Sequence, residues 1–332
     1  MESRFIQVLE ICLPVFAVIG LGKILQWQRV IGTDQRHFIN RLVYNFSLPA
    51  LIFCGVAGQR LDHLFNVSLL VGALLPIAVV ATLFIALSKI FNYTKGYAAA
   101  FIFGSFWANV SYMGFPLARN SFGEAGYAAA SVYNAFAMPV FVILGFSVIG
   151  WFCGKEKGHG VGSILKKALI NPIVSAAFLG VCAAGIASLL RQPDDTLALP
   201  TGLPLFIQLA KKTLMMIGTM GLPLALLSVG AALQLKHTRG NALPLVMVCT
   251  GKLVLVPLFS FLTFRFLLPA TGADVDPAIM GTTVLLSATP NAVASYVVAC
   301  DIGVEEGFVS TMLVLTTSLS IIAIPLWLLV VL

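Results

Sequence analysis

Charged residues are scarce in this sequence of 332 residues, where Asp, Glu, Lys and Arg together make up 10%. Soluble globular domains carry about 25% charged residues. Because 59% of the residues are hydrophobic and the mean hydropathy is +0.98, the composition excludes a soluble domain. It predicts an integral membrane protein with the lipid bilayer as its surroundings.

Signals of several other protein classes are absent. The six cysteines form no C-x-x-C and no cysteine and histidine cluster with metal-ligand spacing, so we expect reduced packing residues and neither a metal nor a cofactor. No G-x-x-x-x-G-K-[ST] phosphate loop is present, which argues against a primary pump. Asp194 and Asp195 are adjacent in a proline-flanked loop, where they indicate a solvated turn rather than an enzyme site.

Long apolar runs are what the sequence has instead. A helix needs about 20 residues to cross the bilayer core, and runs of that order predict an all-α protein with ten transmembrane helices. Their ranges are 5–26, 36–58, 64–90, 96–118, 123–152, 169–190, 203–232, 241–267, 277–299 and 304–331. The first run follows Glu2 and Arg4 and has no A-x-A-like cleavage site, so we expect it to remain as a span.

The basic residues, 20 against 13 acidic ones, lie singly between the apolar runs. This distribution gives no nucleic-acid surface and is better used for topology. Loops after the odd-numbered spans carry more Lys and Arg than loops on the other side, so they are expected to be cytoplasmic, with both termini outside. Residues 154–168 then form a basic cytoplasmic linker between a first five-helix repeat, 1–153, and a second, 169–332.

Short matches in the same order support this division. "LPALIFCGVA" from Leu48 pairs with "LPLALLSVGAAL" from Leu222, and "LPIAVVAT" from Leu75 pairs with "LPLVMVCT" from Leu243. Because each half has an odd number of spans, the second copy must enter the membrane from the opposite side. The pattern predicts two inverted five-helix repeats, a plan typical of transporters.

The fourth and ninth spans share polar residues and a proline at mid-membrane. "WANVSYMGFPLARNSFGEAG" begins at Trp107, and "SATPNAVASYVVACDIG" begins at Ser287. Proline removes a backbone donor and clashes with the preceding turn, so we predict helix breaks at Gly114 and Pro116 and at Pro290. Two broken helices that cross would direct helix N-terminal amides at one point, which favours an anionic ligand.

These motifs resemble the auxin efflux carrier family, which includes plant PIN carriers and bacterial permeases assigned to malonate and malate. The resemblance rests on Asn109, Gly114 and Pro116 in "NVSYMGFP", on "LPLALLSVGAAL", on "GKLVLVP" and on "TPNAVASYVVA", and it extends over essentially the whole chain. The short loop between spans five and six differs from the long loop of many plant carriers and indicates a bacterial-type member.

The resemblance implies a scaffold domain built from spans 1, 2, 6 and 7 and a transport domain built from spans 3–5 and 8–10. It also implies crossed helices 4 and 9, as in bile acid transporters and sodium/proton antiporters, and elevator-type alternating access in the cell membrane. Homodimers formed through the scaffold are normal for this type of fold.

The polar residues near the breaks are the candidate ligands. The most central candidates are Asn109, Ser111, Thr289 and Asn291. Each side chain can either contact a substrate carboxylate or form hydrogen bonds with backbone groups that the helix break leaves unpaired, and both roles stay open. Asn134 in span five either lines the same site or makes an interhelical hydrogen bond. Ser47, two residues before Pro49, is a further candidate.

Lys252 is a lone charge near the centre of span eight. An ammonium group there must pair, lose its proton or hold the carbonyl end of a helix. The resemblance to sodium/proton antiporters favours stabilising the crossover or sensing protonation, with substrate pairing as the alternative.

The sequence therefore predicts a secondary carrier for a small organic carboxylate, either a dicarboxylate such as malonate or malate or an auxin-like monocarboxylate. The alternative is a cation/proton antiporter or channel on a similar fold, although no span carries the paired carboxylates of a dedicated antiporter. Symport with H+ or Na+ and uniport both stay open.

Overall fold

The computed structural model describes residues 2–59, 66–153, 170, 172–190, 203–232, 242–292, 295 and 305–332. Helices account for nearly all of these ranges. In chain order they are α1 (Glu2–Trp27), α2 (Thr33–Leu42), η1 (Val43–Ser47), α3 (Leu48–Ala57), α5 (Val67–Ile90), α6 (Lys95–Gly104), η2 (Val110–Gly114), α7 (Phe115–Cys153), α9 (Pro172–Leu190), α10 (Leu203–Ala232), α11 (Ala242–Thr250), η4 (Gly251–Leu255), α12 (Val256–Leu262), η5 (Thr263–Leu267), α13 (Leu268–Ala270), α14 (Pro277–Ser287) and α16 (Glu306–Val331). The elements labelled η are π-helical turns.

Seven helical segments in the described part of the chain are long and apolar enough to cross a membrane. They correspond to predicted spans one, two, three, six, seven, eight and ten; their ranges are Val8–Trp27, Thr33–Ala57, Val67–Ile90, Pro172–Leu190, Leu203–Ala232, Ala242–Ala270 and Gly307–Val331. The protein is therefore an all-helical, multi-pass membrane protein. The count of ten helices and the inverted repeat remain predictions.

The predicted fourth and fifth spans meet at a sharp turn. Gly123 has φ 60° and ψ −142°, which interrupts α7. A Cβ atom on Gly126 would overlap the carbonyl oxygen of Ala118, whereas residues eight apart in a straight helix are about 12 Å apart. The chain therefore folds back at Gly123, within the sequence "FGEAG".

The π-helical turns follow from proline. In each, the residue directly before a proline donates its N–H to the carbonyl five residues earlier. Proline would clash with the carbonyl four residues earlier in a regular helix, and a widened turn relieves the clash. The four prolines that follow these turns are Pro49, Pro116, Pro257 and Pro269.

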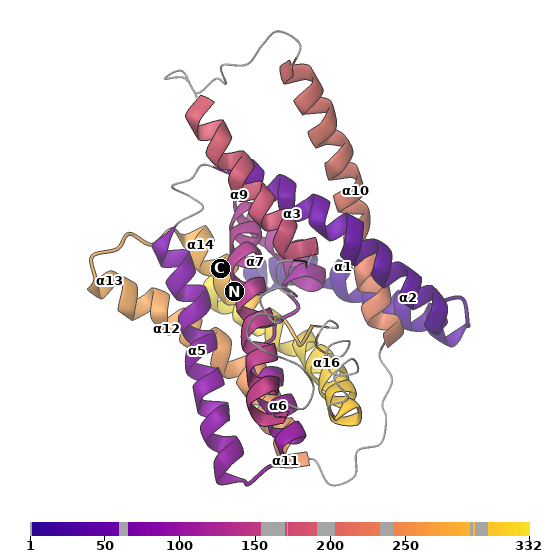
Figure 1. Cartoon of the computed structure of the whole chain (residues 1–332), viewed down its shortest axis with the longest axis vertical. Coiled ribbons are helices and arrows are strands. Elements are labelled where there is room, and N and C mark those ends of the chain that lie inside the picture. Colours follow the sequence, from indigo (N-terminus) through magenta and orange to yellow (C-terminus); the bar gives the residue numbers. More distant parts are fainter. Residues whose placement is uncertain are drawn as a thin grey trace.

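The helices pack as two groups (Figure 1). In the first helix group α1 packs along α10, and α3 packs against both α9 and α10. In the second helix group α14 packs on α7, α5 and α12, while α6 packs on α7 and α16 packs on α11 and α14. The two groups meet mainly where α3 contacts α7 and α1 contacts α16.

Small residues set the spacing within the first helix group. A Cβ atom on Gly22 of α1 would overlap the carbonyl of Leu227, and one on Gly230 of α10 would overlap the carbonyl of Ile19. The two backbones can approach this closely only because glycine has no side chain. Ser228 adds a hydrogen bond to Asn40 of α2, which joins that polar helix to α10.

Candidate functional site

The first helix break lies between α6 and η2. The helix α6 ends at Gly104, and the chain is non-helical until Asn109, which precedes η2. Asn109 caps η2, because its Oδ1 accepts a hydrogen bond from the backbone N–H of Tyr112 at 3.3 Å, a role that asparagine fills well. The break therefore comes before the predicted position. Gly114 is the last residue of η2, and Pro116 is the second residue of α7.

The second helix break follows α14. Asp276 caps the start of α14 by accepting a hydrogen bond from the N–H of Ala278 at 2.7 Å, and the helix ends at Ser287. Pro290 has no N–H and disfavours a helical conformation in the residue before it, so the chain continues without helix through residues 288–292. Here the predicted break and the observed break coincide.

The two breaks lie against each other and pair through their backbones. Ala108 and Asn291 form an isolated antiparallel β-bridge. The N–H of Asn109 donates to the carbonyl of Pro290 at 2.8 Å, and the N–H of Ala292 donates to the carbonyl of Trp107 at 3.2 Å. In a membrane an unpaired backbone group costs several kcal/mol. Each break therefore supplies hydrogen-bond partners for backbone groups of the other break.

Asn291 and Thr289 serve the backbone in this structure. The Asn291 side-chain amide donates to the carbonyl of Gly104 at 2.6 Å, the carbonyl at the end of α6. The Thr289 hydroxyl donates to the carbonyl of Leu286 at 2.7 Å, at the end of α14. Both side chains are fully buried, and both occupy the second of the two roles that the sequence left open.

Asn109 and Asn134 have side-chain donors without partners. Asn109 is 3% exposed and Asn134 is 1% exposed, and neither Nδ2 atom has a hydrogen-bond partner among the described residues. The hydroxyl of Ser111 in η2 donates to Asn134 Oδ1 of α7 at 3.2 Å, so a hydrogen bond joins these two elements. A buried unpaired donor costs about 1–3 kcal/mol and in a native protein commonly marks a bound ligand or water.

Ser47 belongs to the first helix group. It is the last residue of η1, lies against Gly221 of α10, and its buried Oγ has no hydrogen-bond partner among the described residues. Both η1 and η2 pack on α10. The predicted candidates therefore lie on the two sides of the boundary between the helix groups.

The side chain of Lys252 extends from η4 to the C-terminal end of α14 and pairs with no carboxylate in the described part of the chain. Its side chain is fully buried in η4, and Nζ donates to the carbonyl of Ser287 at 2.5 Å. That carbonyl belongs to the last residue of α14, where the helix dipole is negative. The indole N–H of Trp327 on α16 donates to the carbonyl of Leu253 at 2.9 Å and fixes the same π-helical turn.

Thr316 is a contributor that the sequence analysis missed. On α16 it is fully buried, accepts a hydrogen bond from the backbone N–H of Asn291 at 3.2 Å, and donates to the carbonyl of Met312 at 2.9 Å. The signal was present in "TTSLS", a polar cluster that begins at Thr316 within the last apolar run. Tyr133 and Ser287 are two further fully buried residues that carry hydroxyl groups.

A family model described as "Membrane transport protein" matches residues 7–154 and 160–328. The chain belongs to this family of membrane transport proteins. The match covers both predicted repeats and confirms the resemblance to the auxin efflux carriers that the motifs indicated. The family consists of transporters rather than enzymes.

Two relatives match the chain over most of its length. One, from Methanothermobacter thermautotrophicus, is named "Uncharacterized transporter" and is 26% identical over 324 residues, which is 96% of this chain and 96% of the relative. The other, from Rhizobium meliloti, is named "Putative malonate transporter" and is 23% identical over 318 residues, 95% of this chain and 93% of the relative.

Proposed function

We propose that this protein is a secondary carrier that moves small organic acid anions across the membrane by elevator-type alternating access. The observation that carries the proposal is the pairing of residues 105–109 with residues 288–292 beside buried amide donors without partners. Interrupted helices inside a membrane are tolerated where they are buried or line a cavity, and transporters bind substrate at such interruptions.

The donors suit a carboxylate. An ionised carboxylate only accepts hydrogen bonds, and a primary amide offers two N–H donors. Asn109 Nδ2 and Asn134 Nδ2 supply such donors, and Ser111 is hydrogen-bonded to Asn134. The N-terminus of η2, which Asn109 caps, adds a partial positive charge. Ser47 completes the proposed site from the opposite helix group.

A dicarboxylate of malonate or malate size is the favoured substrate class, because one relative carries malonate in its name. An auxin-like monocarboxylate is the second class, in keeping with the wider family. We assign Asn291, Thr289, Pro290, Gly114 and Pro116 to the breaks and their flanking turns, and Lys252 to stabilising the end of α14. These assignments rest on the hydrogen bonds described above.

The two helix groups suggest separate roles in transport for the two parts of the protein. We propose that the first helix group is the scaffold and that the second helix group carries the site and moves against it, within two inverted five-helix repeats. Both termini face outward, residues 154–168 face the cytoplasm of a cell with this protein in its plasma membrane, and the scaffold forms the contact of a homodimer. Coupling to H+, coupling to Na+ and uniport are the three modes to be distinguished.

A cation antiporter on the same fold is the competing function. Lys252 is the one charged side chain that is buried in the described part of the chain. A dedicated cation site needs anionic or oxygen ligands, and no group of three His, Cys, Asp or Glu residues is placed for a metal ion among the described residues. The site chemistry favours the anion.

Uptake by proteoliposomes distinguishes these functions. Labelled malonate, malate and indole acetate are offered with and without imposed proton and sodium gradients. We expect uptake of at least one carboxylate with no covalent product, and its dependence on each gradient identifies the coupling ion. Flux of Na+ or H+ without any carboxylate would support the antiporter and contradict the proposal.

A further inference from the structure

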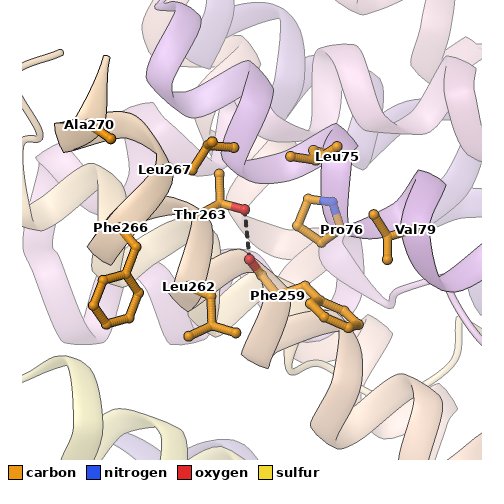
Figure 2. Close-up of a pocket in the computed structure, with 9 residues that line it drawn as sticks. All are labelled: Leu75, Pro76, Val79, Phe259, Leu262, Thr263, Phe266, Leu267 and Ala270. Carbon is orange, nitrogen blue, oxygen red and sulfur yellow. Dashed lines mark hydrogen bonds between the residues drawn. The ribbon is translucent and has the colours of Figure 1, made fainter. Parts of the chain in front are cut away.

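An apolar groove lies between α5 and the segment from α12 to α13 (Figure 2), and none of its lining residues belongs to either helix break. Its volume is about 480 Å³, within the range of about 300–1,000 Å³ typical of small-molecule sites. Leu75, Pro76 and Val79 form one wall, and residues from Phe259 to Ala270 form the other. Both walls belong to helical segments that can cross the membrane.

The groove has a local cause in the sequence. Gly72 allows the ring of Phe264 to pack directly on α5, and the hydroxyl of Ser260 donates to the carbonyl of Gly72 at 2.9 Å. These contacts hold the two helices together at the level of Gly72. Beside them, Pro76 in α5 and the widened turn η5 disturb the regular helix surfaces, so the facing side chains leave space.

The groove is unsuited to the proposed carboxylate. Thr263 supplies the one side-chain hydroxyl of the lining, and it donates to the carbonyl of Phe259 at 2.7 Å, as Figure 2 shows. The other lining side chains are apolar. An anion would lose its hydration there without gaining a hydrogen bond, whereas a hydrocarbon chain needs none.

The groove opens to the outside of the helix bundle, where the bilayer lies. Phe266 is 63% exposed and Leu267 is 46% exposed. Arg265 stands between Phe264 and Phe266 on the same π-helical turn and is also exposed. It forms no ion pair within the described part of the chain. A guanidinium in a membrane helix extends toward the headgroups and binds phosphate with paired hydrogen bonds.

We propose that this groove binds one acyl chain of an anionic phospholipid whose phosphate is held by Arg265. The apolar walls hold the hydrocarbon, and the arginine selects net negative charge. One basic residue near a membrane surface contributes a preference of about fivefold for anionic lipid. None of the lining residues belongs to the helix breaks, so the lipid site and the proposed substrate site are built from different residues.

Native mass spectrometry of the full chain in detergent, titrated with phosphatidylglycerol or phosphatidylcholine, tests the proposal. We expect wild type to retain phosphatidylglycerol more strongly than phosphatidylcholine. Arg265→Gln should reduce that preference about fivefold. Val79→Trp and Ala270→Trp, which fill the groove from opposite walls, should reduce retention of both lipids.

Two matched variants serve as controls. Ile322→Trp adds the same bulk at a position on α16 that is 63% exposed, and Arg41→Gln removes an exposed arginine from the end of α2. Both should retain lipid as wild type does. If Arg265→Gln keeps the full preference, or if the two groove variants retain lipid as well as Ile322→Trp does, the proposal is wrong. Because no transport is measured, that result would leave the proposed carrier function standing.

Discussion

At the scale of single residues, the free amide of Asn109 is the group that most directly links structure to function. Its oxygen is already used to cap η2, while its nitrogen has no partner among the described residues. An aspartate at this position keeps the capping oxygen but loses the donor and adds negative charge. The substitution therefore keeps the cap on η2 and removes the amide donor.

We expect Asn109→Asp to keep the cap on η2, to lose some stability because its carboxylate is buried without a partner, and to lower the apparent affinity for the carboxylate substrate at least tenfold. The reason is that a hydrogen bond to a charged group is worth about 1.5–3 kcal/mol, and about 1.4 kcal/mol is tenfold in affinity. Concentration-dependent uptake measures the effect. Asn40→Asp, which adds the same charge on α2 and keeps an oxygen for Ser228, is the control. Equal loss in both variants would mean that charge alone, and not the site, is responsible.

Lys252 gives a second prediction at this scale. Replacing it with methionine removes the ammonium that holds the carbonyl of Ser287, so the end of α14 loses its cationic partner. We expect a loss of about 2 kcal/mol of stability, seen as a lower melting temperature in detergent, together with slower transport. Lys211→Met, at an exposed position on α10, should change neither. If the Lys252 variant transports at the wild-type rate and with the wild-type pH dependence, Lys252 has no role in transport.

At the scale of helices, glycine determines how closely α1 and α10 pack. Gly22→Ala forces a Cβ into the carbonyl of Leu227, whereas Gly20→Ala on the same helix meets nothing within 4 Å. Overpacking typically costs about 1–3 kcal/mol, so the first variant should melt clearly below the second in a thermal shift assay. Gly20→Ala should match or exceed wild type, because alanine favours helix. Equal melting temperatures would contradict the observed helix packing.

The helix breaks also show what a sequence can and cannot predict. The break at Pro290 can be predicted from the sequence, because proline acts locally on the helix that contains it. The first break was expected at Gly114 and Pro116 but lies at residues 105–109, within the stretch "SFWAN", which contains no proline. What stabilises a non-helical chain there is its pairing with residues 288–292, a contact between distant segments that no local pattern encodes.

The roles of Thr316 and Lys252 illustrate the same limit. Apolar length was sufficient to predict the seven membrane-spanning segments found in the described part of the chain, since the bilayer imposes that length on each helix separately. The partners of Asn291 and Lys252 depend on how helices cross, and each side chain had several chemically reasonable partners before the structure was known. The sequence could therefore propose which residues matter near the breaks, but not which of them serve the backbone.

At the scale of the whole molecule, the contact between the two helix groups must change if one group moves against the other. Gly55 of α3 packs directly on Ser131 of α7, and the hydroxyl of Tyr127 donates to the carbonyl of Leu51 at 2.8 Å. These contacts cross from the first helix group to the second. They should exist in one state of the transport cycle and be lost in another.

A disulfide across this boundary tests that motion. In a background without the native cysteines, Gly55→Cys with Ser131→Cys places two Cβ atoms 2.8 Å apart, so the helices must separate by about 1 Å to reach disulfide geometry. We expect oxidation of the double variant to stop transport and a reductant to restore it to the rate of Gly55→Cys alone, which is the matched baseline because its Cβ already crowds Ser131. A cross-linked protein that transports at the normal rate would show that the groups do not move apart at this contact.

The central claim is that this protein transports an organic anion that binds at its paired helix breaks. Counterflow tests that claim most directly. Proteoliposomes containing the purified protein are loaded with unlabelled malonate, diluted into buffer with a trace of labelled malonate, and followed over time. The account predicts a transient internal accumulation of label that is absent in empty liposomes and strongly reduced in Asn109→Asp. Label that enters no faster than in empty liposomes for malonate, malate and indole acetate alike would contradict it.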